Sequence, residues 1–355
     1  MTIPIVPGVE INLLLLGAVG LVLGVISGFT GVGGGFMMTP ALIILGFPAH
    51  LAVGTSLAWV TGTAIMGTLR HSRLGNIDKK LGALMFLGMV GGIEIGVRIL
   101  NAATSSGLAD QAVLSVAILA LLVIGTYTFH EARRYNYQLW YRYVTDGKAD
   151  TSSTDRTLAN YVRGISLPPN IHFAKSGAKI SLWVILGISL FAGILAGFMG
   201  VGGGFITIPS MIYLFGIESF MAAGTNLFQV AFSTSIGVIR HTMSGNVIIF
   251  AATIMLLGSG IGVQIGTQIT RYVHGVSVKY TLAVAMLVAM LVSALKLVDI
   301  ITGHSLSFLG AAMGFVIILG TAVIITAIGG LFVMELRRRH GKPVPLRILL
   351  LLVRK

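Results

Sequence analysis

The nine residues Gly28–Phe36 return almost unchanged as Gly197–Phe205, 169 positions later in a chain of 355 residues. Each copy lies in strongly apolar surroundings, and a proline, Pro40 or Pro209, follows five residues after its last glycine. A glycine run of this kind interrupts a hydrophobic helix. One such interruption in each half of a membrane chain is typical of a transporter's substrate site. The chain is therefore expected to be two copies of one unit.

The composition predicts an integral membrane protein. Hydrophobic residues make up 55% of the chain and charged residues only 10%, whereas a soluble domain is about one quarter charged. Apolar runs near the roughly 20 residues that a membrane-crossing helix needs recur along the sequence. Strand-like alternation is absent, so we expect an all-α, polytopic helical bundle rather than a barrel.

Several chemistries are excluded by the residues that are missing. The chain has no cysteine, which rules out disulfides, thiol catalysis and thiolate metal sites. It has no phosphate-binding loop for ATP, no His-Glu-x-x-His pair and no cluster of metal ligands. We therefore expect no catalytic residues, no metal and no cofactor. The net charge of +13 comes from basic residues in loops and tails beside apolar spans, a pattern that reflects membrane orientation rather than nucleic-acid binding.

The apolar runs predict a series of spans in each half, of which two are too short for a full crossing. The first run lacks a basic leader and is interpreted as a retained span. The short segments 33–46 and 203–215 are expected to be re-entrant, tilted or halves of broken helices. The predicted spans are 11–29, 33–46, 52–70, 81–100, 111–129, 180–199, 203–215, 221–239, 248–270, 280–297 and 306–334.

The two halves correspond well beyond the glycine motif. Gly54-Thr55 matches Gly224-Thr225. Arg70-His71 matches Arg240-His241. Three ladders of glycines at strict four-residue spacing each mark one helix face, which indicates close helix packing. The ladders are Gly20/Gly24/Gly28, Gly88/Gly92/Gly96 and Gly258/Gly262/Gly266.

The positions of the basic residues predict inverted repeats. With five crossings per repeat and the N-terminus outside, 21 of the 24 Lys and Arg residues are cytoplasmic; four crossings per repeat would give 14. Basic residues concentrate on the cytoplasmic side of membrane proteins. The expected organisation is a first transmembrane repeat (1–129), a cytoplasmic connecting segment (130–179), a second transmembrane repeat (180–297), and a final transmembrane helix with a basic cytoplasmic tail (298–355). For the connecting segment we expect a linker with an interfacial helix, with a regulatory or partner-binding role as the alternative.

The paired glycine motifs, together with the Gly-Thr-Ser/Asn-Leu and Arg-His…Gly-Asn motifs, resemble the sulfite exporter TauE/SafE family. The resemblance covers most of the chain apart from the connecting segment, the last span and the tail. It implies a secondary carrier of sulfur-containing anions, such as sulfite, sulfoacetate or similar organosulfonates, in a prokaryotic plasma membrane. The long basic connecting segment departs from the common size of the family.

The glycine runs are the first candidates for binding an anion. Successive glycines resist regular helix and can aim backbone N–H groups at one point, and the following helix start adds a positive dipole. Close helix approach is the alternative role. The candidate residues are Gly33, Gly34, Gly35, Gly202, Gly203 and Gly204.

Polar residues after the Gly-Thr motifs are candidates to complete the site. Hydroxyl and amide groups can donate to sulfonate oxygens, but they could equally cap the spans that begin there. Gln229 follows one turn later on the same face, and Trp59 takes its place in the first half, which would make the site asymmetric. The candidates are Thr55, Ser56, Thr225, Asn226 and Gln229.

A third group of residues could attract the anion, gate the path or couple transport to protons. Arg240 departs from the cytoplasmic bias and is a candidate substrate ligand, whereas Arg70 could be an ordinary anchor. His71 and His241 could carry protons, with an interfacial position as the alternative. Glu94 is an intramembrane carboxylate that could couple protons, although Arg98 four residues later suggests an ion pair.

These features predict a non-enzymatic secondary transporter that exports a small sulfur-containing anion by alternating access, with the lipid bilayer and the anion as its partners. An anion channel, or a membrane sensor that uses the segment 130–179, is the alternative.

Overall fold

A computed structural model of the chain describes residues 2–6, 9–146, 167–273, 275–303 and 308–340. Eight of the helices in these ranges are long and apolar enough to cross a membrane. This confirms an all-α polytopic membrane protein. The segments expected to be short are indeed the two shorter apolar helices, Gly35–Ile44 and Gly204–Leu214.

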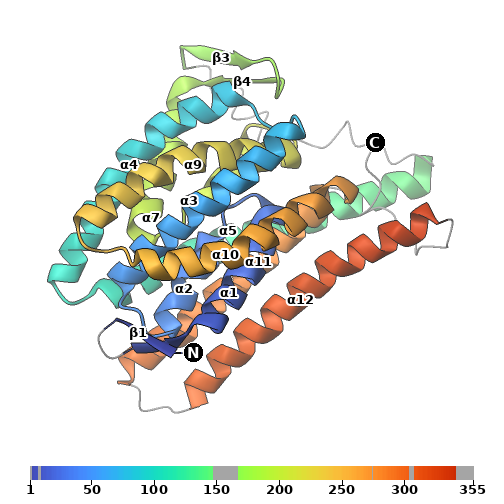
Figure 1. Cartoon of the computed structure of the whole chain (residues 1–355). Coiled ribbons are helices and arrows are strands. Elements are labelled where there is room, and N and C mark those ends of the chain that lie inside the picture. Colours follow the sequence, from blue (N-terminus) through green and yellow to red (C-terminus); the bar gives the residue numbers. More distant parts are fainter. Residues whose placement is uncertain (1, 7–8, 147–166, 274, 304–307, 341–355) are drawn as a thin grey trace.

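The helices follow the duplicated order of the sequence (Figure 1). The first half contains α1 (Leu13–Thr30), α2 (Gly35–Ile44), α3 (Ala49–Arg73), α4 (Lys79–Ser105) and α5 (Ala109–Asp146). The second half contains α7 (Leu182–Met199), α8 (Gly204–Pro209), the π-helical turn η1 (Ser210–Leu214), α9 (Ser219–Met243), α10 (Ile249–Ile269), the 3-10 turn η2 (Thr270–Tyr272) and α11 (Gly275–Ile301). The last helix is α12 (Phe308–Arg339).

The connecting segment differs from the expected linker. Helix α5 continues unbroken past residue 129 to Asp146, and a hairpin of β3 (Asn170–Phe173) and β4 (Ala178–Ser181) precedes α7. Phe173 and Ile180 of this hairpin pack with Met211 in η1 and with Phe215 directly after it. A second hairpin, β1 (Thr2–Val6) with β2 (Val9–Asn12), precedes α1. These two short hairpins were not predicted from the sequence, whereas the helical bundle expected in place of a barrel is confirmed. Residues 147–166 of the connecting segment, which include the sequence Thr-Ser-Ser-Thr at 151–154, lie outside the described residues.

Equivalent helices of the two halves run in opposite directions. Thr61 of α3 donates a hydrogen bond to Thr234 of α9 at 2.8 Å, while Gly67, further along α3, lies against Leu227, earlier in α9. In the same way Gly125 of α5 lies against Met286 of α11, and Phe129 stacks edge-on against Tyr280. Residue numbers rise along one helix as they fall along its partner. These antiparallel contacts between equivalent helices are the ones expected of inverted repeats.

The glycine ladders lie where helices of opposite halves touch backbone to backbone. Helix α1 packs along α10, and α4 packs along α7. A Cβ atom added at Gly24 would lie 2.7 Å from the Cα of Ser259, and one at Gly96 would lie 2.7 Å from the nitrogen of Phe198. No side chain fits into such gaps. The ladders therefore have the packing role that their spacing predicts.

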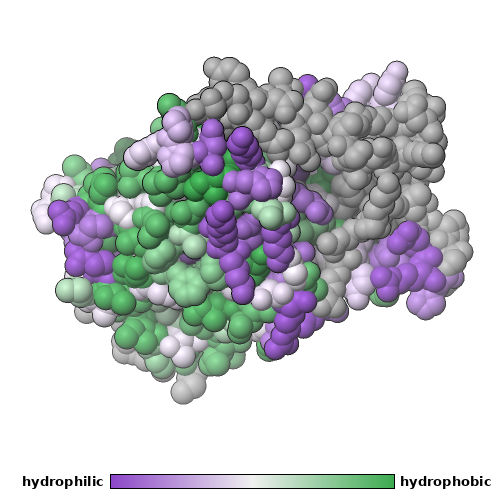
Figure 2. Space-filling model, turned by 90° about the horizontal axis from the view of Figure 1, so that it is seen from above, coloured by the Kyte–Doolittle hydropathy of each residue, from purple (hydrophilic) through white to green (hydrophobic). Residues whose placement is uncertain are grey.

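Large apolar side chains cover the outside of the bundle. Leu87, Leu257 and Phe315 are all more than half exposed, and Figure 2 shows apolar residues over much of the face seen from above. This surface suits contact with lipid. Helix α9 is not among the eight apolar helices. Its polar residues Asn226 and Gln229 are fully buried, so these side chains lie inside the bundle.

We predict that Gly92→Ala destabilises the protein and that the adjacent Gly91→Ala does not. A Cβ at Gly92 would lie 2.8 Å from the Cα of Gly193, whereas at Gly91 the nearest atom is a leucine methyl at 3.5 Å. Overpacking of this kind costs about 1–3 kcal/mol. Thermal unfolding in detergent compares the two variants, and equal midpoints would show that α4 and α7 are not in backbone contact.

Candidate functional site

Each glycine motif ends one helix and starts the next through backbone angles that favour glycine. Gly31 caps the end of α1 with a φ of 76°, and Gly34 caps the start of α2 with a φ of 74°. Gly200 and Gly203 take the same places between α7 and α8, both with a φ of 74°. Side chains are strained in this left-handed region. We call residues 31–35 the first glycine corner and residues 200–204 the second glycine corner.

The two glycine corners touch each other inside the protein. A Cβ atom at Gly35 would lie 2.8 Å from the carbonyl oxygens of both Gly200 and Val201. In return, a Cβ at Gly204 would overlap the carbonyl oxygen of Val32. Every residue of both corners is buried. The structure thus brings together the six glycines that the sequence marks as candidates.

The half-helices that leave the corners begin with N–H groups outside the helical ladder. In α2 the first bonds run from the N–H groups of Met37 and Met38 to the carbonyl of Gly34, at 3.2 and 3.3 Å. In α8, Ile206 and Thr207 donate to the carbonyl of Gly203, both at 3.1 Å. The N–H groups just ahead of these donors have no partner within their own helix. Two positive helix ends therefore start where the corners meet.

Several buried polar groups near the corners lack a hydrogen-bond partner within the described residues. Trp59 presses its ring edge against Gly34, with a ring carbon 2.8 Å from a Cβ placed there, and its indole N–H is unpaired. Ser56, one turn earlier on α3, has an unpaired hydroxyl, as does Ser27 of α1. Gln229 of α9 has an unpaired amide oxygen. Unpaired buried groups are rare in native proteins and call for an explanation.

Asn226 has a different role from Ser56, its equivalent in the first half. Its amide nitrogen donates to the carbonyl of Gly31 at 2.8 Å, and its oxygen accepts from Thr207 of α8 and from Gln229 at 3.1 Å. Asn226 therefore fastens the second half-helix to the first glycine corner. Ser27 and Thr207 were not singled out from the sequence, because neither has a matching polar residue in the other half.

Thr55 and Thr225 neither cap a helix nor line the corners. They lie within α3 and α9, whose N-caps are Pro48 and Glu218, so the capping alternative is wrong. The Thr225 hydroxyl accepts a hydrogen bond from the N–H of Asp78 at 2.9 Å. Thr55 accepts from the N–H of Ile248 at 3.0 Å. Each threonine thus binds the loop before a helix of the opposite half, and the two contacts are reciprocal.

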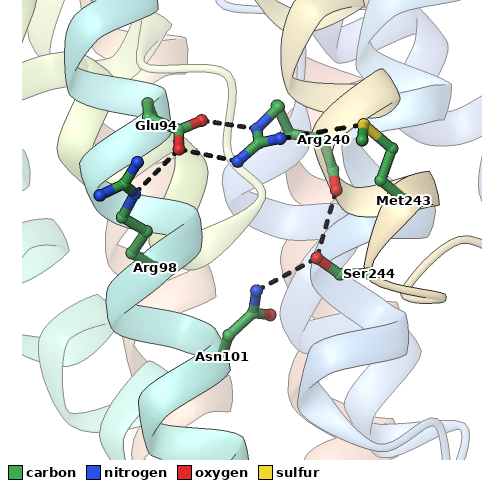
Figure 3. Close-up of polar contacts among 6 residues, drawn as sticks. All are labelled: Glu94, Arg98, Asn101, Arg240, Met243 and Ser244. Carbon is green, nitrogen blue, oxygen red and sulfur yellow. Dashed lines mark hydrogen bonds and ion pairs between the residues drawn. The ribbon is translucent and has the colours of Figure 1, made fainter.

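Glu94 joins the two halves through Arg240 (Figure 3). Its carboxylate accepts from Nε and Nη2 of Arg240 at 2.5 and 2.7 Å, and from Nε of Arg98 at 2.9 Å. The same-helix pair with Arg98 is present, but the bidentate partner comes from α9. Because Glu94 already occupies these donors of Arg240, a substrate anion would have to compete with a carboxylate for them.

Arg70 also connects helices of opposite halves, and His241 contacts the second glycine motif. Arg70 donates to Gln268 of α10 rather than only anchoring the chain in its own loop. His241 is fully buried, and its Nε2 lies 3.0 Å from the carbonyl oxygen of Gly197, the first residue of the second glycine motif. His71 is fully buried as well. Both rings are therefore enclosed by protein, in the last turns of α3 and α9.

A small apolar pocket lies beside the corners, between α2 and α5. Its lining consists of Phe36, Thr39, Pro40, Ile43, Val113, Leu114, Ala117, Met199 and Val201. Within the described ranges, no group of three or more His, Asp or Glu residues is arranged to hold a metal ion.

Comparisons with known proteins agree with the duplicated helical architecture. The model of the family described as sulfite exporter TauE/SafE matches residues 16–297. The chain belongs to this family. Two relatives from Bacillus subtilis (strain 168) are the probable membrane transporter proteins YjnA and YunE. YjnA is 26% identical over 79% of this chain and 97% of its own length, and YunE is 23% identical over 73% and 89%. No solved structure matches the chain significantly. Helix α12 lies beyond the part that the TauE/SafE model matches.

We predict that Thr225→Val lowers stability more than Thr225→Ser. The valine would leave the buried N–H of Asp78 without an acceptor, which costs about 1–3 kcal/mol, whereas serine keeps the oxygen. Thermal unfolding measures both variants. A valine variant as stable as the wild type would contradict the reciprocal docking of the two halves.

We also predict that Glu94 couples more strongly to Arg240 than to Arg98. Double-mutant cycles with Glu94→Gln, Arg240→Gln and Arg98→Gln measure the two pairwise energies. The bidentate contact between helices should give about 0.5 kcal/mol or more, and the exposed same-helix pair should give less. The reverse order would contradict a link between the halves at this point.

Proposed function

We propose that the protein is a secondary carrier that exports a small sulfur-containing anion, such as sulfite, sulfoacetate or a similar organosulfonate, across the plasma membrane by alternating access. The observation that carries this proposal is the meeting of the two buried glycine corners. Each corner starts a helix there, and the two come from halves whose equivalent helices run in opposite directions. Transporters of this architecture bind their substrates at such broken helices.

The corners suit an anion without a fixed positive charge. The sequence has no Lys, Arg, Asp or Glu between Ile11 and Leu69, which covers the whole first corner and its helices. Backbone N–H groups and helix dipoles attract an anion in the absence of a full charge. Binding of this kind is strong enough for capture and weak enough for release, which a carrier needs at every cycle.

The neighbouring side chains suit the shape of a sulfur oxyanion. The hydroxyl of Ser56 and the indole N–H of Trp59 are unpaired donors on α3, and the Trp59 ring lies against Gly34 of the first corner. Sulfite or a sulfonate offers three oxygens as acceptors. The family description names sulfite, which belongs to this class of anion.

The contacts between the halves are suited to alternating access. Glu94 with Arg240, and Arg70 with Gln268, each join helices of opposite halves. Because the ladders join α1 to α10 and α4 to α7 across the two halves, each of these pairs would move as one rigid bundle. Rocking of such a bundle against α3 and α9 would break and remake the polar contacts. With the N-terminus outside and the C-terminus cytoplasmic, as the basic residues indicate, an inside-negative potential of 100 mV favours exit of one anionic charge by about 2.3 kcal/mol. This direction supports export.

Transport assays separate a carrier from a channel. In proteoliposomes loaded with radiolabelled sulfite, a carrier gives saturable flux that unlabelled sulfite on the opposite side stimulates. Flux that rises linearly and shows no counter-flow would instead indicate a pore. The sensor alternative is tested by removing residues 147–166, because intact flux in that variant would count against a protein whose main function lies in this segment.

We predict that Ser56→Ala weakens anion binding without lowering stability, and that Trp59→Phe weakens it with a loss of stability from the ring volume removed from the core. Each change removes a donor that has no partner in the described structure, so the folded protein loses no internal hydrogen bond. A donor to a charged ligand contributes about 1.5–3 kcal/mol, which is roughly a tenfold or greater rise in Kd. Thermal shift against sulfite, sulfoacetate, taurine, sulfate and a plain carboxylate measures binding, since a ligand of the folded state raises its apparent stability.

The control for these variants is Ser293→Ala in α11. Ser293 is also fully buried, but its hydroxyl donates to the carbonyl of Ala289 at 2.8 Å. The control should leave the ligand-induced shift unchanged. Wild-type anion shifts in both Ser56→Ala and Trp59→Phe would contradict a substrate site at the first glycine corner.

A further inference from the structure

A buried lysine lies at the far end of the second half-helix from its glycine corner. Lys279 of α11 is only 8% exposed. Its ammonium lies 4.4 Å from the ring centre of Tyr135 in α5 and 5.1 Å from that of Tyr213 in η1. Within the described residues it makes no ion pair with a carboxylate, and the nearby Glu131 acts on it only through space. A buried ammonium without a hydrogen-bonding anion is unusual.

Tyr213 supplies a second donor at the same place. Its hydroxyl is buried and has no hydrogen-bond partner in the part of the chain that the structure describes. Its ring packs edge-on against Tyr127, with the ring centres 5.4 Å apart, so the side chain is held in place by aromatic contacts rather than by its polar end. The free O–H of Tyr213 and the N–H groups of the Lys279 ammonium beside its ring can both donate to the oxygens of an oxyanion.

The helix that carries Tyr213 departs from regular geometry at this point. The N–H of Phe215 donates to the carbonyl of Ser210 at 3.0 Å, which closes a π-helical turn directly after Pro209. The equivalent half-helix α2 has no such turn. Single π-turns within helices occur frequently at functional sites. The turn therefore marks an asymmetric feature that only the second half possesses.

We propose that Lys279 and Tyr213 form a second anion-binding station, which takes sulfite or a sulfonate and passes it along the half-helix to the glycine corners. This proposal rests on the proposed transport function. The two rings hold the ammonium by their π faces and leave its N–H donors for the ligand. Ten residues of helix separate Gly203 from Tyr213, about 15 Å at the helical rise, so this station is distinct from the corners. In the orientation that the basic residues indicate, it lies toward the cytoplasm, where an exported anion enters.

The station is tested by the half-saturating sulfite concentration in counter-flow, together with the thermal unfolding midpoint of each variant. Lys279→Met removes the charge at similar volume and should raise half-saturation at least about tenfold, while Tyr213→Phe should raise it several-fold. Lys279→Arg should stay close to the wild type. The unfolding midpoint of Lys279→Met should not fall, because the lost ammonium has no ion-pair partner. Lys79→Met, which removes an equal charge from the exposed start of α4, is the matched control.

The outcomes separate this station from the transport function itself. If the wild-type protein carries neither sulfite nor sulfoacetate, both proposals fail. If wild-type flux is saturable and Lys279→Met and Tyr213→Phe keep its half-saturation, the station is overturned and the carrier stands. A lower unfolding midpoint with unchanged half-saturation would make Lys279 a structural residue and would also overturn it. If Lys279→Met does not fold, Tyr213→Phe decides the question, because it removes only an unpaired hydroxyl.

Discussion

Close approach of main chain to main chain is the constraint on which the rest of this structure depends. Along α1 with α10, and α4 with α7, glycines remove the side chains that would hold the helices apart. The same residue permits the left-handed angles at Gly34 and Gly203, where each helix stops and restarts. Because helices of opposite halves pack this closely, their two corners are pressed together in the interior. A chain with larger residues in place of these glycines could form the helices but could not bring the corners into contact.

The polar residues of the bundle divide into those that join the halves and those left without a partner. Three side chains form hydrogen bonds with backbone groups of the opposite half, namely those of Thr55, Thr225 and Asn226. Ser56 and Trp59, on the same helix as Thr55, have unpaired donors, and Trp59 lies against the first corner. Equivalent helices of the two halves therefore differ in the polar groups that remain available to a ligand.

The sequence predicted the features that repeat and missed those that occur once. Duplication, inversion, the ladders and the two glycine corners could all be inferred, because glycine spacing and the placement of basic residues record backbone geometry directly. The contact of Thr55 with Ile248 could not, since its partner is a backbone N–H 193 residues away that any residue type could supply. The π-turn around Tyr213 has no counterpart in the first half. Single residues such as Ser27 become candidates only when their burial and lack of a partner are known.

The most direct measurement is an experimental density map of the protein in a bilayer mimetic with saturating sulfite. The account predicts density for the anion where the first and second glycine corners meet, within hydrogen-bond distance of the N–H groups that start α2 and α8 and close to Ser56 and Trp59. It would be contradicted by a map in which the two corners lie apart, or in which the anion binds elsewhere and the corners are filled only by packed side chains.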